Sequence, residues 1–133
     1  ILMYNKNSYL KDISISIYYD KDTYTLFIFY LHQGDNLMNQ MYKNLKAENN
    51  AIILDVREDY EYKEGHIKGC LHIPLHMLED HACEALEDLH QPIYVYCRAG
   101  VRSKVGCHIL ESQGYDKVYN LGAISDWPEE LEK

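Results

Sequence analysis

Hydrophobic and polar residues change their spacing several times along this chain, and each spacing predicts a kind of element. A short continuous hydrophobic run is typical of a strand buried in a parallel sheet, whereas hydrophobic residues three or four positions apart indicate a helix. Because the two patterns alternate, we expect an α/β domain with a mainly parallel sheet. The predicted strands are 51–56, 70–74, 92–97 and 117–121, and the predicted helices are 38–46, 57–65, 76–89, 100–113 and 124–133.

Two of these helices show which side they are expected to bury. Val101, Val105 and Ile109 are four positions apart, so we expect them to form the buried side of the helix over 100–113. The helix over 57–65 is short and polar. We interpret its acidic residues as a solvated face: Glu58, Asp59, Glu61 and Glu64.

The first 37 residues follow a different pattern. Ile13, Ile15 and Ile17 alternate with serines, residues 20–22 offer a turn, and residues 23–31 are again rich in strand-forming types, which is typical of a β-hairpin. A hairpin alone is marginally stable, so it would have to pack against the main domain or a second copy. A disordered or non-native leader explains the segment equally well. We therefore divide the chain into an N-terminal extension, residues 1–37, and one domain, residues 38–133.

Composition and charge narrow the range of functions. The formal net charge is −8, which argues against nucleic acid or an anionic membrane as a partner because both would need a basic surface. No hydrophobic stretch approaches the roughly 18 residues of a membrane span, and the start does not read as a secretory signal. Four cysteines without a CxxC pair are expected to be reduced thiols. We therefore expect a cytoplasmic protein.

The stretch YVYCRAGVRS, residues 94–103, carries the strongest chemical signal. Cys97 ends a predicted strand, and a short loop with Arg98, Gly100 and Arg102 leads from it into a predicted helix. Active sites of parallel sheets lie at this edge, where backbone N–H groups and the helix N-terminus favour an anion. Together with two arginines they should favour the thiolate of Cys97 over the thiol. A buried structural cysteine would require this whole arrangement to be coincidental.

Four segments in the same order resemble the rhodanese family of sulfurtransferases. They are ILDVREDYEYKEGHIKG from residue 53, LHIPL from residue 71, YVYCRAGVRS from residue 94 and VYNLGAISDW from residue 118. The resemblance covers about residues 38–130 and implies a rhodanese-like three-layer fold, with helices on both faces of the sheet. Cys70 and Ala123 depart from the usual pattern, but both changes are small and concern packing.

The resemblance also implies a chemistry and a set of site residues. Cys97 would take sulfane sulfur from a small anionic donor such as thiosulfate, hold it as a persulfide, and pass it to a thiol, to cyanide or to a thioredoxin-like protein. Arg57 would be a second cationic contact for the donor, and Asp55 and Ser103 would support the loop. No cofactor is implied, and the oligomeric state is left open. The residues that would form the cradle around the donor are Arg98, Ala99, Gly100, Val101 and Arg102.

Two other functions use the same type of fold. Phosphatases and arsenate reductases attack their anion with a cysteine in a loop of the form Cys-x5-Arg. Here Arg102 follows Cys97 as Cys-x4-Arg, and the shorter ring suits a sulfur atom better than a tetrahedral phosphate. A non-catalytic rhodanese-like binding module is the third alternative, which the presence of Cys97 disfavours.

The remaining histidines and cysteines are interpreted as structural. Cys70, His72, His76, His81 and Cys83 follow no zinc-ligand spacing, so we expect no metal site there. His66 is interpreted as a residue that stabilises a turn. Cys107 lies ten residues beyond Cys97 and is expected to be part of the core.

Overall fold

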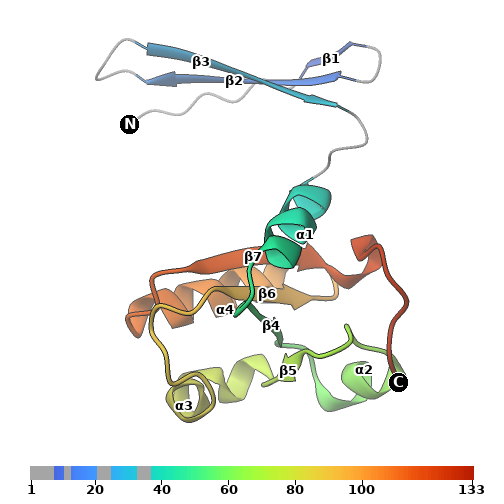
Figure 1. Cartoon of the computed structure of the whole chain (residues 1–133), viewed down its shortest axis with the longest axis vertical. Coiled ribbons are helices and arrows are strands. Elements are labelled where there is room, and N and C mark those ends of the chain that lie inside the picture. Colours follow the sequence, from blue (N-terminus) through green and yellow to red (C-terminus); the bar gives the residue numbers. More distant parts are fainter. Residues whose placement is uncertain (1–7, 11–12, 21–24, 33–36) are drawn as a thin grey trace. The chain divides into compact units, whose positions relative to one another are not determined.

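The computed structural model describes residues 8–10, 13–20, 25–32 and 37–133, and the chain divides into two compact units, residues 1–40 and 41–133 (Figure 1). The division between the units lies within helix α1, Leu37–Ala47. The domain boundary expected after residue 37 stays a prediction. Among the described residues, no helix is long and hydrophobic enough to cross a membrane.

The first unit contains a three-stranded antiparallel sheet in the order β1-β2-β3. Its strands are β1, Ser8–Leu10; β2, Ile13–Asp20; and β3, Thr25–His32. Strands β2 and β3 pair along their whole length, from Ile13 opposite His32 to Asp20 opposite Thr25. These are the two strands of the predicted hairpin, and the residues that connect them, 21–24, lie outside the described residues.

The second unit is an α/β fold around a parallel sheet in the order β5-β4-β6-β7 (Figure 1). This architecture is the one that the alternating pattern predicts. After α1 the elements are β4, Ile52–Asp55; α2, Asp59–Glu64; β5, Leu71–His72; α3, Leu75–Ala85; β6, Ile93–Cys97; α4, Val101–Ser112; β7, Val118–Ala123; and a short 3-10 helix η1, Ile124–Asp126.

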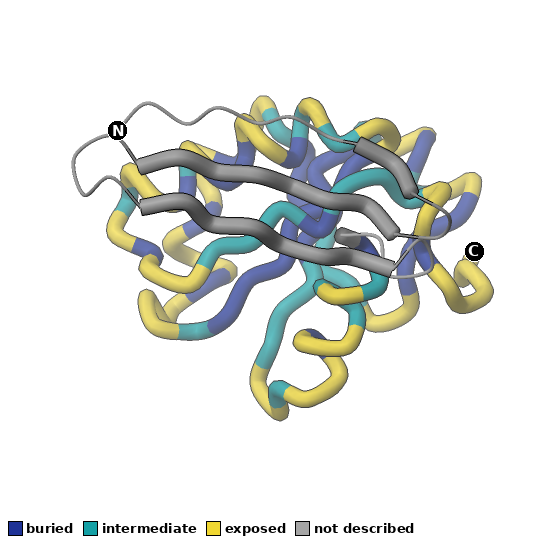
Figure 2. Tube along the Cα trace, turned by 90° about the horizontal axis from the view of Figure 1, so that it is seen from above, coloured by how far each residue is buried: buried dark blue, intermediate teal, exposed yellow. Residues whose placement is uncertain are grey.

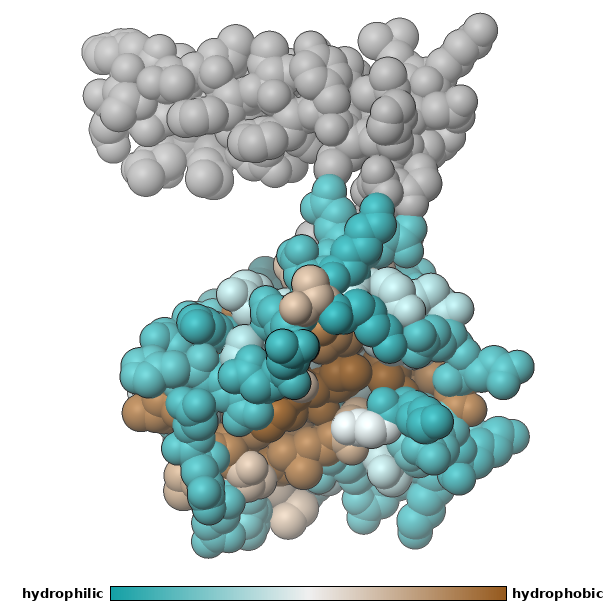
Figure 3. All heavy atoms as spheres, viewed as in Figure 1, coloured by the Kyte–Doolittle hydropathy of each residue, from teal (hydrophilic) through white to brown (hydrophobic). Residues whose placement is uncertain are grey.

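Strand β6 lies between β4 and β7 and is buried along its whole length. Buried residues form the interior of the unit, while exposed residues lie on the outer turns and helix surfaces (Figure 2). Hydrophobic side chains gather at the centre of the face seen in Figure 3, with hydrophilic ones around them. The last residue of β6, Cys97, pairs with Ala123 of β7, while the pairing of β6 with β4 ends one residue earlier, at Tyr96.

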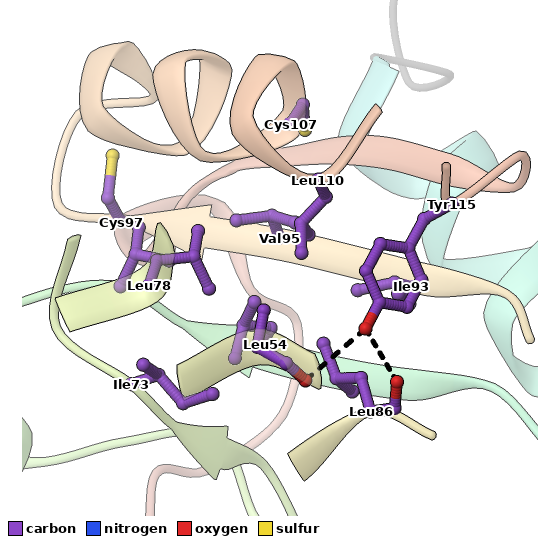
Figure 4. Close-up of a cluster of buried hydrophobic side chains, with 12 residues drawn as sticks. Leu54, Ile73, Leu78, Leu86, Ile93, Val95, Cys97, Cys107, Leu110 and Tyr115 are labelled. Carbon is purple, nitrogen blue, oxygen red and sulfur yellow. Dashed lines mark hydrogen bonds between the residues drawn. The ribbon is translucent and has the colours of Figure 1, made fainter. Parts of the chain in front are cut away.

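Side chains alternate between the two faces of β6. Ile93, Val95 and Cys97 belong to the hydrophobic cluster that also contains Leu78 of α3 and Leu110 of α4 (Figure 4). On the other face, the Tyr94 hydroxyl donates to Glu48, just after α1. Helices therefore cover both faces of the sheet, as a three-layer fold requires.

The buried side of α4 differs from the predicted one. Val101 is 71% exposed and Val105 is 46% exposed, so the expectation that they face the core is wrong. The side that faces the sheet consists of Ser103, Gly106, Cys107 and Leu110. A Cβ on Gly106 would lie 3.3 Å from Val95, which shows how closely the helix approaches β6. Small residues permit this approach, and a search for large hydrophobic residues overlooks them.

Two predicted helices end earlier than expected. Helix α3 stops at Ala85 instead of residue 89, and Leu89 is 43% exposed. The terminal helix over 124–133 is wrong beyond the single turn of η1. Trp127 precedes Pro128, which disfavours helical backbone, and its ψ of 127° is extended. Glu132 instead exchanges two backbone hydrogen bonds with His66 at 2.8 Å.

Candidate active site

The sulfur of Cys97 lies under a short loop that connects β6 to α4. Gly100 has a φ of 90°, a left-handed conformation that glycine adopts without strain, and this turns the chain back over the sulfur. The N–H groups of Gly100 and Ser103 donate to Cys97 Sγ, with N···S distances of 3.0 and 3.3 Å. Cys97 is only 1% exposed. We call these two donors the N–H cradle.

The hydrogen bonds around Cys97 lower the pKa of its thiol. Burial acts to raise the pKa of the thiol, but the Ser103 side chain and the N–H groups of Ser103, Ala99 and Gly100 outweigh it, so the pKa is lowered from its ordinary value. These hydrogen-bond donors make the largest favourable contributions, and the positive charge of Arg102 also interacts with the Cys97 sulfur. The site thus presents a buried sulfur whose thiolate form is favoured by backbone N–H groups and by the Ser103 side chain.

Ser103 is held in place by a residue that the sequence analysis missed. Its hydroxyl donates to Asn120 Oδ1 at 2.7 Å and lies 3.0 Å from the Gly100 carbonyl. Asn120 sits where the register of β6 and β7 shifts, and the Gly122 N–H donates to the same Oδ1 at 3.0 Å. An asparagine within a strand pattern was the available signal, because a polar side chain at a bulge serves to aim another group.

The loop residues differ in how far their side chains take part. Arg98, Ala99 and Val101 are exposed, and Arg98 is therefore a cation open to solvent. The Arg102 guanidinium is instead paired: it donates to both carboxylate oxygens of Glu61 at 2.7 and 2.8 Å. Glu61 is 3% exposed, so its assignment to a solvated helix face is wrong. Helix α2 points this carboxylate toward α4, a pairing between residues 41 apart that sequence spacing does not reveal.

Arg57 and Asp55 form a buried ion pair beside the site. The Arg57 side chain donates to the Asp55 carboxylate at 2.8 to 3.2 Å and to the Gly65 carbonyl at 2.7 Å. The Tyr96 hydroxyl donates to Asp55 at 2.6 Å and receives the N–H of Ile67. The side-chain partners of Asp55 are thus Arg57 and Tyr96, and its predicted support of the Cys97 loop stays a prediction. The partners of Arg57 are likewise internal, and its predicted contact with a donor remains a prediction.

Aromatic rings and thiols complete the surroundings. The Tyr62 ring is stacked between His66 and His72, with centroids 3.8 and 4.4 Å away, and His66 Nδ1 lies 2.9 Å from the Tyr62 carbonyl. Cys107 lies in the hydrophobic cluster with Cys97 (Figure 4), where burial raises its pKa to about 12. Among the described residues, no group of three or more His, Cys, Asp or Glu side chains is arranged to hold a metal ion.

The model of the rhodanese-like domain matches residues 38–130. The chain belongs to the rhodanese-like family. The match includes Cys97, the loop after it and the residues that support the loop. The four segments that resemble the family in the sequence therefore identify it correctly.

Three known proteins show how far the likeness extends. YrkF of Bacillus subtilis is 37% identical over 86 residues, which are 64% of this chain and 45% of YrkF, so this chain spans less than half of that relative. The thiosulfate sulfurtransferase PspE of Escherichia coli is 34% identical over 73 residues, 55% of this chain and 70% of PspE. A rhodanese structure with anions from E. coli has a TM-score of 0.60 at 31% identity, over 62% of this chain and 98% of that one.

Proposed function

We propose that this protein is a sulfurtransferase that carries sulfane sulfur on Cys97. The observation that supports this most strongly is the N–H cradle, which holds a lowered-pKa sulfur at the end of β6. Relatives of the same family include a thiosulfate sulfurtransferase. A thiolate of this kind is a good nucleophile toward another sulfur atom.

The proposed reaction has two displacement steps. The Cys97 thiolate attacks the outer sulfur of a donor such as thiosulfate, a sulfur–sulfur bond forms, and sulfite leaves with the electron pair of the broken bond. The persulfide anion then lies among the N–H donors and the positive end of α4. An acceptor nucleophile, cyanide or a thiol, attacks the outer sulfur, forms a bond to it and releases the Cys97 thiolate. No cofactor is needed because each step conserves electrons between the reactants.

Each loop residue has a proposed role in these steps. Gly100 and Ser103 supply N–H groups to the sulfur, and Ser103 also supplies a hydroxyl. Arg98 supplies the solvent-exposed cation that attracts a small anionic donor. The backbone N–H groups of Ala99, Val101 and Arg102 complete the lining of the loop at the start of α4, where they have no helical acceptor.

The loop is less suited to phosphate chemistry. The Gly100 and Ser103 N–H groups already close on Cys97 Sγ itself, so a tetrahedral anion would have to displace or widen them. The Arg102 side chain, which a phosphatase would direct at phosphate, is paired with Glu61. Cysteine-dependent phosphatase or arsenate reductase activity therefore remains the alternative.

The acceptor and the compartment are further proposals. Cys97 is almost fully buried, so an acceptor has to reach the outer sulfur of the persulfide, which a small nucleophile or a thiol on a protruding protein loop can do. We infer a thioredoxin-like protein as one such acceptor. The four cysteines are free thiols, which fits a reducing compartment such as the cytoplasm.

One experiment separates sulfur transfer from its alternatives. The protein is incubated with thiosulfate and its intact mass is measured, followed by addition of cyanide and detection of thiocyanate. We expect a gain of one sulfur atom that is lost on addition of cyanide, and neither effect in Cys97→Ser. Cys97-dependent cleavage of an aryl phosphate, with no gain of sulfur, would instead assign a phosphatase. No reaction with either anion would assign a binding module.

A further inference from the structure

The Arg102 guanidinium is held in an ion pair within the protein and is therefore not a free cation. Both nitrogens contact the Glu61 carboxylate, and the residues come from different helices, α4 and α2. Such a two-point contact fixes the plane of the guanidinium as well as its position. Arg102 is one residue before Ser103, so this contact also fixes the first turn of α4 at the N–H cradle.

Glu61 itself is firmly oriented. Its Oε2 accepts hydrogen bonds from Arg102 and from the Glu58 N–H, the latter at 2.9 Å. Its Oε1 accepts only the second Arg102 nitrogen among the contacts described. The side chain is 3% exposed, so its negative charge acts through protein rather than through water. The charges of Glu61 and Arg102 therefore cancel close to the site.

This arrangement affects which anions the site prefers. A free arginine beside a reactive thiolate would attract a doubly charged anion more strongly than a singly charged one. With Arg102 neutralised, the remaining attraction comes from N–H groups and from exposed Arg98. The attraction of an anion to N–H dipoles increases less with the charge of the anion than its attraction to a full positive charge does.

We propose that Glu61 is a positioning and specificity-determining residue, which holds Arg102 against the Cys97 loop and cancels its charge so that singly charged sulfane donors compete with thiosulfate. The inference rests on the proposed sulfur transfer for its substrate class. The predicted effect of the Arg102 charge on anions that approach Cys97 does not rest on sulfur transfer, because it concerns the thiolate alone.

The test variant is Glu61→Gln. A glutamine oxygen at the place of Oε2 keeps the contacts with Glu58 and with one Arg102 nitrogen, so the substitution removes the charge and only one of three hydrogen bonds. Glu64→Gln is the matched control, because Glu64 is an exposed residue of the same helix. The double variant Glu61→Gln with Arg102→Gln removes both charges together.

The readout is alkylation of Cys97 by iodoacetate, an anion, relative to neutral iodoacetamide at one pH. The ratio cancels the thiolate fraction, and peptide mass spectrometry measures it at Cys97 and at exposed Cys83 as an internal reference. In Glu61→Gln the ratio at Cys97 should rise about three- to tenfold through the uncompensated charge of Arg102. It should stay within about twofold of the wild type in the double variant and in Glu64→Gln, because neither leaves Arg102 uncompensated.

Two results would overturn the proposal. One is an unchanged ratio in folded Glu61→Gln. The other is a several-fold fall in the double variant, because Arg102 would then already act on the thiolate in the wild type. The double variant keeps the test decisive if Glu61→Gln does not fold. As a second measurement, kcat/KM for thiosulfate relative to an aryl thiosulfonate, a single anion, should rise in Glu61→Gln. A protein inert to both donors would refute sulfur transfer and leave the alkylation result standing.

Discussion

The hydroxyl of Ser103 donates to Asn120 Oδ1 at 2.7 Å, and the same hydroxyl oxygen lies 3.5 Å from Cys97 Sγ. A hydroxyl has one proton, so at a given moment it donates to only one of three acceptors: Asn120 Oδ1, the Gly100 carbonyl or the sulfur. When Cys97 is a thiol, its S–H donates to Ser103 and the hydroxyl proton goes to Asn120. When Cys97 is a thiolate, the hydroxyl can turn to the sulfur. Asn120 therefore holds the Ser103 hydroxyl close to Cys97 Sγ.

Removing this hydroxyl should make the thiolate less favourable. In Ser103→Ala the pKa of Cys97 should rise, because the thiolate loses a hydrogen bond to a charged group, a contact that contributes about 1.5 kcal/mol. The measurement is the pH dependence of iodoacetamide alkylation at Cys97. Ser112→Ala, at the far end of α4, is the control and should leave the profile unchanged. A profile of Ser103→Ala identical to the wild type would show that the backbone N–H groups act alone.

The buried ion pair of Asp55 and Arg57 should stabilise the fold. Arg57→Ala leaves the carboxylate of Asp55, which is 0% exposed, without its main partner, at a cost of about 3–5 kcal/mol in the free energy of unfolding. Urea titration measures this. Arg98→Ala, which removes an exposed arginine, should change the free energy by less than about 0.5 kcal/mol. If Arg57→Ala were fully stable and only raised the KM for thiosulfate, Arg57 would be a donor contact, as the sequence suggested.

The Glu61–Arg102 pair should make the free energy of unfolding depend on pH. Hydrogen bonds from Arg102 lower the pKa of Glu61 to about 2, with burial opposing and the Glu58 N–H assisting. The lowered pKa means that this contribution is fully present above the ordinary value of 4.5 and is lost as pH falls from there to about 2. Since Arg102 is partly exposed, it amounts to no more than about 3 kcal/mol.

Urea unfolding at several pH values tests this contribution. The wild type should exceed Glu61→Gln in free energy of unfolding at pH 7, and the difference should shrink steadily below about pH 4.5. Glu64→Gln should run parallel to the wild type throughout. A difference between wild type and Glu61→Gln that stayed constant down to about pH 2.5 would mean that the carboxylate charge contributes nothing.

The segment before residue 38 should be dispensable for the chemistry. All residues assigned to the site lie within the family match over 38–130, and the units divide inside α1. A fragment of residues 38–133 should therefore be soluble, unfold cooperatively and form thiocyanate at a rate within about twofold of the full chain. An insoluble or inactive fragment would make the hairpin an integral part of the domain.

Local signals explain what the sequence could predict. The hydrophobic runs of β4 and β6 and the glycine before α4 act within a few residues, so the strands and the loop around Cys97 were foreseeable. The partners of Ser103 and Arg102 were not, because Asn120 and Glu61 come from distant segments that meet only in the fold. The buried side of α4 was missed for another reason: close packing selects small residues there, and these carry little hydrophobic signal.

The burial of Cys97 has a consequence for the direction of attack on a persulfide. An acceptor thiol that struck the inner sulfur would become disulfide-linked to the protein and expel hydrosulfide, which ends the cycle in a dead end. Cys97 is 1% exposed and the N–H groups of Gly100 and Ser103 contact Sγ, so in the proposed persulfide the inner sulfur would be the more shielded of the two. We therefore expect an incoming nucleophile to reach the outer sulfur more readily than the inner one. Steric shielding of Sγ would thus set the regiochemistry of the proposed transfer, and turnover should proceed without accumulation of mixed disulfides at Cys97.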